Sequence, residues 1–330
     1  MYKPKKTRRM PMATKQTRVG LARTDERRRN VFTALDLVRD DITPKLREQV
    51  MLKPNFLSST NQLASTHVDA IRGAMDFLLT VPEPPQEIII AEGANQAFSG
   101  EAFENFGYKS LLDEYALPIR LVDLHQDEGW EETPVILADR SEIPVRMPKT
   151  VLDCPCTISV AVAKTHDVDV VTLALKNMIM GTLHLSDRIK MHGYHSHADR
   201  ELPREAQTLN INLIRLSRHL CPDIAVIDGT VGLQGNGPGG TDSIPLGIAV
   251  ASADVFAADA VTTKAMGFEP LEIGLFHYAN EMGYGVADLE QIDVLGTPVA
   301  EVIKPFKPHE TAHLQFQWQE ADAARYLNIG

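Results

Sequence analysis

The feature of this 330-residue chain that most restricts its fold is a repeated alternation between short apolar runs and amphipathic segments. The runs at 87–93 (EIIIAEG) and 157–163 (TISVAVA) are almost continuously apolar, which is typical of parallel strands covered on both faces. Segments such as 66–79 and 201–220 repeat their apolar residues at helical spacing. The alternation predicts an α/β fold with a mainly parallel, doubly wound sheet and helices on both faces.

Individual elements follow from the same patterns. The predicted strands cover 18–23, 48–55, 87–93, 118–124, 157–163, 223–229 and 246–252. The predicted helices cover 25–38, 66–79, 100–108, 168–181, 201–220, 253–267 and 270–283. Asp25 and Thr66 are expected to cap the first two helices, and Gly181 is expected to end the fourth.

The domain organisation is expected to be simple. Residues 1–17 carry six basic residues and no acid, and are predicted to be a disordered basic tail. Residues 18–300 form the α/β domain, with a subdivision or an inserted hairpin near 125–150, and residues 301–330 form a C-terminal extension.

Charge and cysteine content exclude several classes of function. The formal net charge is −11, and outside residues 1–30 the chain has 22 basic and 42 acidic residues, a balance that disfavours nucleic acid as a partner. No apolar run is long enough to cross a membrane. The three cysteines make no disulfide scaffold, and a cytoplasmic location is therefore expected.

Polar residues follow four predicted strands at the point where each strand ends. They are 53–55 (KPN), 92–95 (EGAN), 164–166 (KTH) and 228–229 (DG). Because ligands of open α/β sheets bind beyond the carboxyl ends of the strands, these groups are expected to line one crevice.

Three lysines adjoin apolar runs in this set. A buried cation is costly unless it is paired or faces a ligand, so Lys53, Lys164 and Lys176 predict a small anionic metabolite, a carboxylate or a phosphate. The glycine-rich stretch 232–240 lets the backbone approach such a ligand closely. The residues expected to hold the substrate are Lys53, Asn55, Asn177, Asn236 and Gly237, and those expected to act on it are His166, Lys164, Lys176 and Asp228.

Histidines and cysteines leave a second class of function open. His184, His192, His195 and His197 lie in one polar stretch just after His166, and Cys154 and Cys156 precede a strand. Such side chains can bind a metal ion, although their spacing matches no standard zinc pattern and a four-cysteine cluster cannot form in one chain. Buried, unreactive cysteines are the favoured interpretation of the cysteine pair.

These blocks resemble the prokaryotic family of the domain of unknown function 362. The resemblance rests on KPN at 53–55, on KTH at 164–166 followed by TLALKNMIMG, on DG…GNGP at 228–238, and on a block that contains Asp254 and Asp259. Many members of that family carry a ferredoxin-like segment with iron–sulfur clusters, and this chain has no such run of cysteines. The resemblance implies a site and a compartment, but no particular reaction.

The leading hypothesis is an enzyme that acts on a small anionic metabolite, with a divalent metal as one candidate cofactor. The metal ligands would be His166, His184 and Asp259. The alternative is a metal or cofactor handling protein without turnover, which would use His166, the histidine-rich stretch, Cys154 and Cys156. A nucleic-acid binder led by the basic tail is the weakest hypothesis, and self-association of the chain stays open.

Overall fold

The fold is described from a computed structural model that covers residues 16–95 and 99–327. The tail predicted to be disordered lies outside these residues, apart from its last two positions. The strands are β1 (Thr17–Ala22), β2 (Gln49–Lys53), β3 (Glu87–Glu92), β4 (Ile119–Asp123), β5 (Trp130–Ile136), β6 (Glu142–Pro148), β7 (Thr157–Thr165), β8 (Val171–Thr172), β9 (Ile224–Leu233), β10 (Ser243–Ile244), β11 (Ile248–Ser252) and β12 (Ile292–Gly296). The helices are α1 (Arg27–Leu37), α2 (Arg39–Ile42), α3 (Val68–Leu78), α4 (Ser99–Asn105), α5 (Leu111–Glu114), α6 (Lys149–Leu152), α7 (Ala174–Met180), α8 (Arg188–Met191), α9 (Arg204–Leu220), α10 (Val255–Ala265), α11 (Gly274–Met282), α12 (Ala312–Gln315) and α13 (Ala323–Leu327).

One large sheet organises the molecule. Its strand order is β12-β1-β11-β9-β7-β2-β3-β4, with β8 added to β7 and β10 added to β9. Strands β9, β7, β2, β3 and β4 are mutually parallel, whereas β11 runs antiparallel to both of its neighbours. The predicted α/β class with a mainly parallel sheet is confirmed, and the carboxyl ends of five parallel strands meet along one edge.

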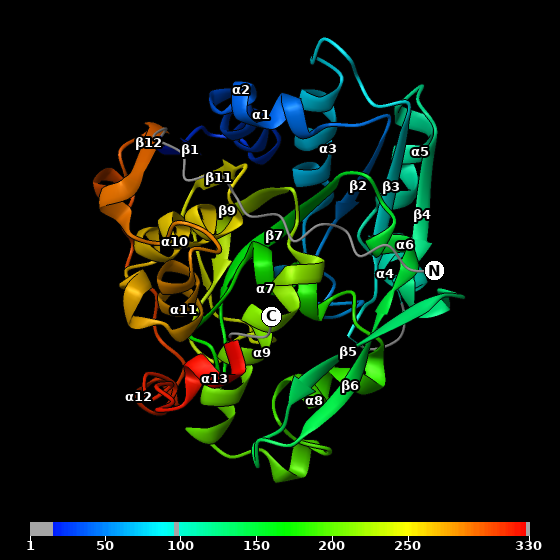
Figure 1. Ribbon diagram of the computed structural model, residues 1–330. Coiled ribbons are helices and arrows are strands. Elements are labelled where there is room, and N and C mark those ends of the chain that lie inside the picture. The colour runs from blue at the N-terminus through cyan, green and yellow to red at the C-terminus, as the bar shows by residue number, and fades with distance from the viewer. Residues whose placement is uncertain (1–15, 96–98, 328–330) are drawn as a thin grey trace.

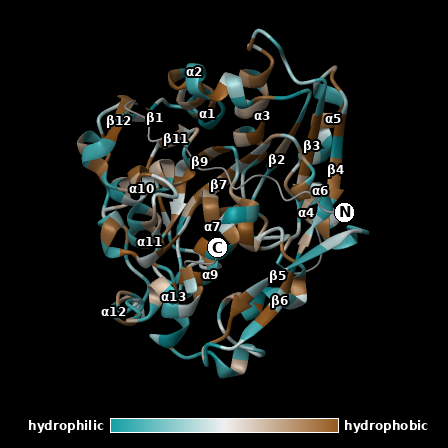
Figure 2. Cartoon of the chain, in the orientation of Figure 1, coloured by the Kyte–Doolittle hydropathy of each residue, from teal (hydrophilic) through white to brown (hydrophobic). Residues whose placement is uncertain are grey.

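Two hydrophobic layers cover the sheet (Figure 1). Helices α1 and α3 pack on one face, and α7, α9, α10 and α11 pack on the other. The strands between them are largely hydrophobic, as Figure 2 shows. Burial of apolar side chains on both faces explains why strands such as β7, which is buried along its whole length, read as continuous apolar runs.

Two segments lie outside this layered core. Strands β5 and β6 form an antiparallel hairpin beside the main sheet, within the segment 125–150 where a subdivision or an inserted hairpin was expected. The C-terminal extension folds back onto the domain, where Gln315 donates a hydrogen bond to the His166 carbonyl and accepts one from the Val170 amide. No helix among the described residues is long and apolar enough to cross a lipid bilayer.

The helix predicted at 168–181 is shorter than expected. Only Ala174–Met180 is helical, because residues 166–172 form a tight hairpin that pairs β8 with the end of β7. The hairpin closes through a hydrogen bond from the His166 amide to the Val170 carbonyl, 2.9 Å long. The carboxylate of Asp259 then caps the shortened helix by accepting from the amides of Ala174 (2.8 Å) and Leu175 (3.0 Å).

Both predicted helix caps are wrong by one residue. Helix α3 is capped by His67, whose ring accepts from the Asp69 amide. The Thr66 hydroxyl instead accepts from the Asn55 amide, just after β2, and donates to the Val160 carbonyl within β7. The N-cap of α1 is Glu26 rather than Asp25, and no side-chain oxygen caps it. In each case the pattern places the helix start correctly to within two residues.

Candidate functional site

Lys53 lies at the end of β2 in a fully buried ion pair. Its ammonium donates to the carboxylate of Glu92, which ends the neighbouring strand β3. It also donates to the Pro54 carbonyl (2.7 Å) and to Asn177 Oδ1 (2.9 Å). Burial lowers the pKa of Lys53 to about 8, although the Glu92 carboxylate opposes this effect.

Two asparagines link Lys53 to a second lysine. Asn177 Oδ1, which accepts from Lys53, also accepts from Asn55 Nδ2 at 2.9 Å. Asn55 Oδ1 in turn accepts from the ammonium of Lys164 at 2.6 Å. The predicted residues Lys53, Asn55, Lys164 and Asn177 therefore form one continuous hydrogen-bonded network across the ends of β2 and β7.

Lys164 differs from Lys53 in its partners. Its ammonium is buried and donates to Asn55 Oδ1 and to the Ala64 carbonyl (2.9 Å), and no carboxylate among the described residues pairs with it. Burial lowers the pKa of Lys164 to about 7; the Glu92 charge opposes this effect, and the charges of Lys53 and Lys176 add to it. A lysine in this state is divided between ammonium and free amine near neutral pH.

Lys176 pairs with a carboxylate on the hairpin that follows β7. Its ammonium lies 3.4 Å from Asp169 Oδ2, and both side chains are buried. Burial lowers the pKa of Lys176 and raises that of Asp169. Asp169 Oδ1 and Thr172 Oγ1 are buried nearby without a hydrogen-bond partner, so this end of the network retains unused acceptor and donor capacity.

His166 belongs to a neighbouring group of charged side chains. Its Nδ1 accepts from the Val168 amide (3.0 Å), and its ring stacks at 6.3 Å on that of His192. His192 contacts Glu205, and Arg200 bridges Glu205 to Asp167. Burial and the Lys176 charge hold the pKa of His166 well below its usual range, so the imidazole is neutral at pH 7.

The charges of the network do not balance. The cations in and around it are Lys53, Lys164, Lys176 and Arg188, whose guanidinium donates to the Gly93 carbonyl. The carboxylates are Glu92, paired with Lys53, and Asp169, paired with the neighbouring Lys176. Including the adjacent Arg200, Asp167 and Glu205 still leaves one cation in excess when Lys164 is protonated. This excess disfavours the charged form of Lys164 and favours a bound anion.

Asp228 lies in the middle of β9, which continues to Leu233 instead of ending at 228–229 as predicted, and it faces a different group. Its Oδ2 accepts from Arg27 Nε at 2.7 Å and its Oδ1 accepts from the Thr230 amide. Asp228 and Arg27 line a cavity of about 380 Å³, whose remaining lining residues are Gln62, Leu63, Ser65, His67, Val162, Val231, Thr241 and Ser243. The expected role of Asp228 as a free acid or base is therefore not supported, because both its oxygens are engaged.

The glycine-rich loop does not reach the lysines. Gly237 packs so tightly on the Thr165 backbone that a Cβ atom would overlap it, which accounts for the glycine at this position. Asn236 is exposed and accepts from the Glu310 amide at 3.4 Å. The structure thus places these two predicted substrate residues against β7 and the C-terminal extension, outside the hydrogen-bonded network.

The predicted metal ligands are not assembled. His184 contacts Arg146 and Ser186, Asp259 caps α7, and His166 faces His192, so the three predicted ligands make separate contacts. Among the described residues no three histidine, cysteine, aspartate or glutamate side chains converge as a metal site. Of the loop histidines, His195 and His197 are exposed.

The cysteine pair does not form a ligand pair either. Cys154 packs in the hydrophobic layer on the α7 face and Cys156 in the layer on the α1 face. Burial raises the pKa of both thiols, that of Cys156 to about 12, so neither is a thiolate at neutral pH. The interpretation of these cysteines as buried structural residues agrees with this placement.

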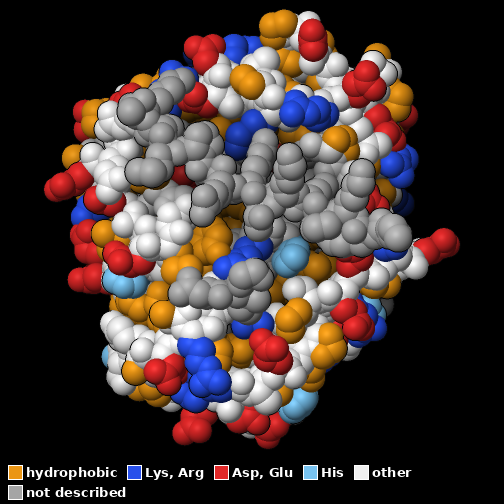
Figure 3. All heavy atoms as spheres, viewed as in Figure 1, with side chains coloured by type: hydrophobic (Ala, Val, Ile, Leu, Met, Phe, Trp, Pro, Cys, Tyr) orange, Lys and Arg blue, Asp and Glu red, His pale blue; other side chains and the backbone are white. Residues whose placement is uncertain are grey.

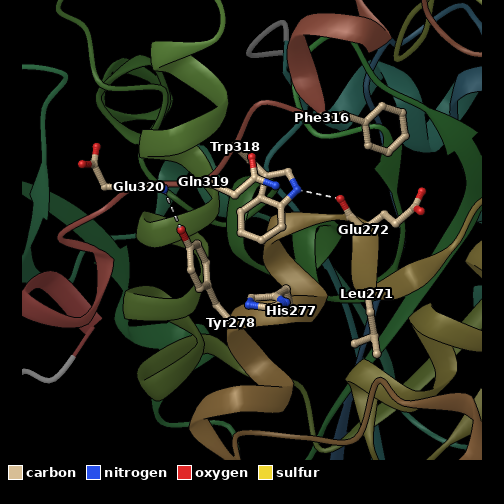
Figure 4. A pocket seen from close by; sticks show the side chains of 8 residues that line it. All are labelled: Leu271, Glu272, His277, Tyr278, Phe316, Trp318, Gln319 and Glu320. Atoms are coloured by element: carbon tan, nitrogen blue, oxygen red, sulfur yellow. Dashed lines mark hydrogen bonds between the residues drawn. The ribbon is translucent and has the colours of Figure 1, made fainter.

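A larger cavity, of about 620 Å³, lies between α11 and the C-terminal extension and is lined by His277, Tyr278 and Trp318 among others (Figure 4). Trp318 donates to the Glu272 carbonyl (2.6 Å), and the Tyr278 hydroxyl accepts from the Glu320 amide. It contains none of the predicted site residues. The strand-end network is the better candidate for a functional site, because it contains a lysine of lowered pKa and lies near buried polar atoms without a hydrogen-bond partner. The aromatic side chains of this cavity pack on one another.

Figure 3 shows the face seen in Figure 1. Near its middle a basic side chain lies beside a histidine among apolar residues, while most of the acidic side chains in view lie toward the edges.

Gly181 provides a test of how tightly the network is packed. A Cβ atom at this position would overlap the Lys53 ammonium and lie 2.8 Å from the Asn177 carbonyl. Gly181→Ala is therefore expected to lower the free energy of unfolding by about 1–3 kcal/mol, measured by urea denaturation. The control is Gly100→Ala in α4, where a Cβ meets nothing within 4 Å. Equal stability of the two variants would contradict the packing argument.

Fold and site together define a class of protein: an α/β protein that carries a buried, lysine-rich polar network at the carboxyl ends of parallel strands. The chain belongs to the DUF362 family, a domain of unknown function whose family model matches residues 50–264. That range contains Lys53, Asn55, Lys164, His166, Lys176 and Asn177, but not Arg27.

Two known proteins are similar to this chain. The thylakoid-associated protein sll1697 of Synechocystis is 24% identical over 278 residues, which cover 78% of each chain. The lactate racemase apoprotein of Thermoanaerobacterium thermosaccharolyticum is 10% identical, with a TM-score of 0.46 over 76% of this chain. The match spans 57% of the racemase chain, little more than half its length.

Proposed function

We propose that this protein is an enzyme that moves a proton on a small anionic metabolite, a carboxylate or a phosphate, with Lys164 as the general base. The observation that carries the proposal is the state of Lys164: it is buried, bonded only to neutral oxygens, and has its pKa lowered to about 7. A base whose pKa lies near the working pH is the most effective proton acceptor.

The neighbouring groups have distinct roles in this proposal. Lys53 is held by Glu92 and keeps Asn177 and Asn55 in place, so it acts as a positioning residue. Lys176 supplies positive charge that favours an anionic substrate, and the neutral His166 beside it can donate a hydrogen bond from Nε2. The proton that Lys164 accepts is returned to the substrate by the Lys164 ammonium. These assignments make Lys164 the group that accepts the proton from the substrate.

A deuterium-exchange screen tests the proposal. The protein is incubated in D₂O with carboxylate and phosphate metabolites, and exchange of carbon-bound hydrogen is followed by proton NMR. Compounds are selected first by the rise in melting temperature that they produce, because a ligand of the folded state stabilises it. We expect at least one anionic compound to raise the melting temperature and to exchange a carbon-bound hydrogen for deuterium.

The matched control is Lys45, which like Lys164 donates to two neutral oxygens, in this case the carbonyls of Asp223 and Ala253, but does so beside the amino end of β9. Lys45→Met should retain exchange and Lys164→Met should lose it. Unchanged exchange in Lys164→Met would refute the assignment of the base.

A metal is not needed in this proposal, and the described residues do not fit one. We also propose a cytoplasmic location, supported by the free state of all three cysteines. Cell fractionation with an antibody against the chain tests the location, and recovery in a washed membrane fraction would count against it.

A further inference from the structure

The cavity beside Asp228 borders a segment that contacts the strand-end network. It has a volume of about 380 Å³, which suits a small metabolite. Leu63 and Ser65 line it, and Ala64 between them carries the carbonyl that accepts from Lys164. The cavity therefore borders the short helix η2 (Gln62–Ala64) that holds the Lys164 ammonium.

Arg27 presents an unused hydrogen-bonding edge to this cavity. Its Nε donates to Asp228, and within residues 16–95 and 99–327 its two terminal nitrogens have no partner. About a fifth of the Arg27 side chain is exposed, whereas Asp228 is buried. A guanidinium fixed through Nε keeps a planar pair of N–H donors free, and such a pair matches the two oxygens of a carboxylate or a phosphate.

His67 adds a donor to the same wall. Its Nδ1 accepts from the Asp69 amide at 3.1 Å, so in the neutral ring the proton is on Nε2. Burial and the Arg27 charge lower the pKa of His67, which keeps the ring neutral. Thr241 and Ser243, both exposed, supply hydroxyls at the rim.

We infer that Arg27, oriented by Asp228, binds the anionic group of the substrate in this cavity. The inference rests on the proposed function and names the place where that substrate is held. Asp228 neutralises part of the Arg27 charge. The affinity for an anion therefore comes from the geometry of the paired donors and from the neighbouring His67 rather than from net charge. A small ligand anchored here lies against η2, whose Ala64 carbonyl accepts from the Lys164 ammonium.

Titration calorimetry with inorganic phosphate and with malonate tests the inference and separates the two kinds of anion. Wild-type protein is expected to bind at least one of them, and Arg27→Met is expected to weaken that binding at least tenfold. Arg27→Lys keeps the charge but loses the paired donors, and is expected to bind more weakly than wild type. Arg29→Met is the matched control, since Arg29 is exposed on the same helix and does not line the cavity.

Equal affinity of Arg27→Met, or of Arg27→Lys if the methionine variant does not fold, would overturn the inference, as would the absence of binding by wild type. Failure of the proposed function is a separate result. Lys164→Met should still bind the probe anion, because the anionic group is held by Arg27, while it loses proton exchange, which requires the substrate to extend past Ala64 to the Lys164 amine. If Lys164→Met retains exchange and Arg27→Met loses binding, the anion site is supported and the assignment of Lys164 as the base is refuted.

Discussion

Glu92→Gln is expected to lower the free energy of unfolding by about 3–5 kcal/mol, the largest loss of stability that we predict for a single isosteric change. Glu92 is the carboxylate that pairs with the buried Lys53 ammonium, and both side chains are almost completely inaccessible to solvent. Glutamine keeps the shape and the oxygen that accepts from the Phe56 amide at 3.1 Å, but it replaces the oxygen that accepts from Lys53 with an NH2 group, so the change removes the charge and this acceptor together. Equilibrium urea unfolding at pH 7 measures the loss.

The same strand offers a matched control. Glu87 begins β3, where it pairs with Arg120 near the surface, and Glu87→Gln should cost less than about 1 kcal/mol. The double variant Lys53→Met, Glu92→Gln should be more stable than Glu92→Gln alone, because no uncompensated charge remains buried. Similar losses at Glu87 and Glu92, or no recovery in the double variant, would show that this ion pair does not control stability.

The strand-end part of the site could be predicted because local sequence encodes it. A lysine that directly follows a buried strand must lie at the sheet edge, and parallel strands bring such edges together. Lys53 and Lys164 end β2 and β7, which are neighbours in the sheet, and Asn55 and Asn177 join them. Periodicity and strand-end chemistry were sufficient for this set of residues.

The partners of these residues could not be predicted, since they depend on which strands become neighbours. The sequence pattern places Glu92 at the end of a strand, but only the β2–β3 pairing makes it the counter-ion of Lys53. Arg27 lies in a run of three arginines that is typical of a solvated helix face, and its approach to Asp228 joins residues 201 positions apart. Asp259 was expected to bind metal and instead caps α7, because the shortened helix starts where its carboxylate lies.

The network also explains why a costly arrangement persists. Three buried lysines with two paired carboxylates destabilise the fold relative to an apolar core of similar shape. Charged groups of this kind are retained at functional sites, where the perturbed pKa of a buried side chain is what the chemistry requires. Removal of Lys164 should therefore abolish the function without a comparable loss of stability.

Lys164→Met is expected to reduce proton exchange on the substrate by a factor of about 10²–10⁴ without a comparable loss of stability at pH 7. Folded Lys164 loses its proton near pH 7, whereas in the unfolded chain it keeps the proton up to its ordinary value of 10.5. Between these values the unfolded chain binds more protons, so this lysine makes stability rise with pH. The cost of burying its charge is fully present below pH 7 and disappears as the pH approaches 10.5.

Urea unfolding of both proteins between pH 7 and 10 measures this difference. The stability of wild type relative to Lys164→Met should increase over that range by a value on the order of 4 kcal/mol, since three pH units separate the two ends. Lys53, whose pKa is about 8, is present in both proteins and does not enter the difference. Parallel stability curves would mean that Lys164 keeps an ordinary pKa in the folded protein, and an ammonium in that state could not serve as the base at neutral pH.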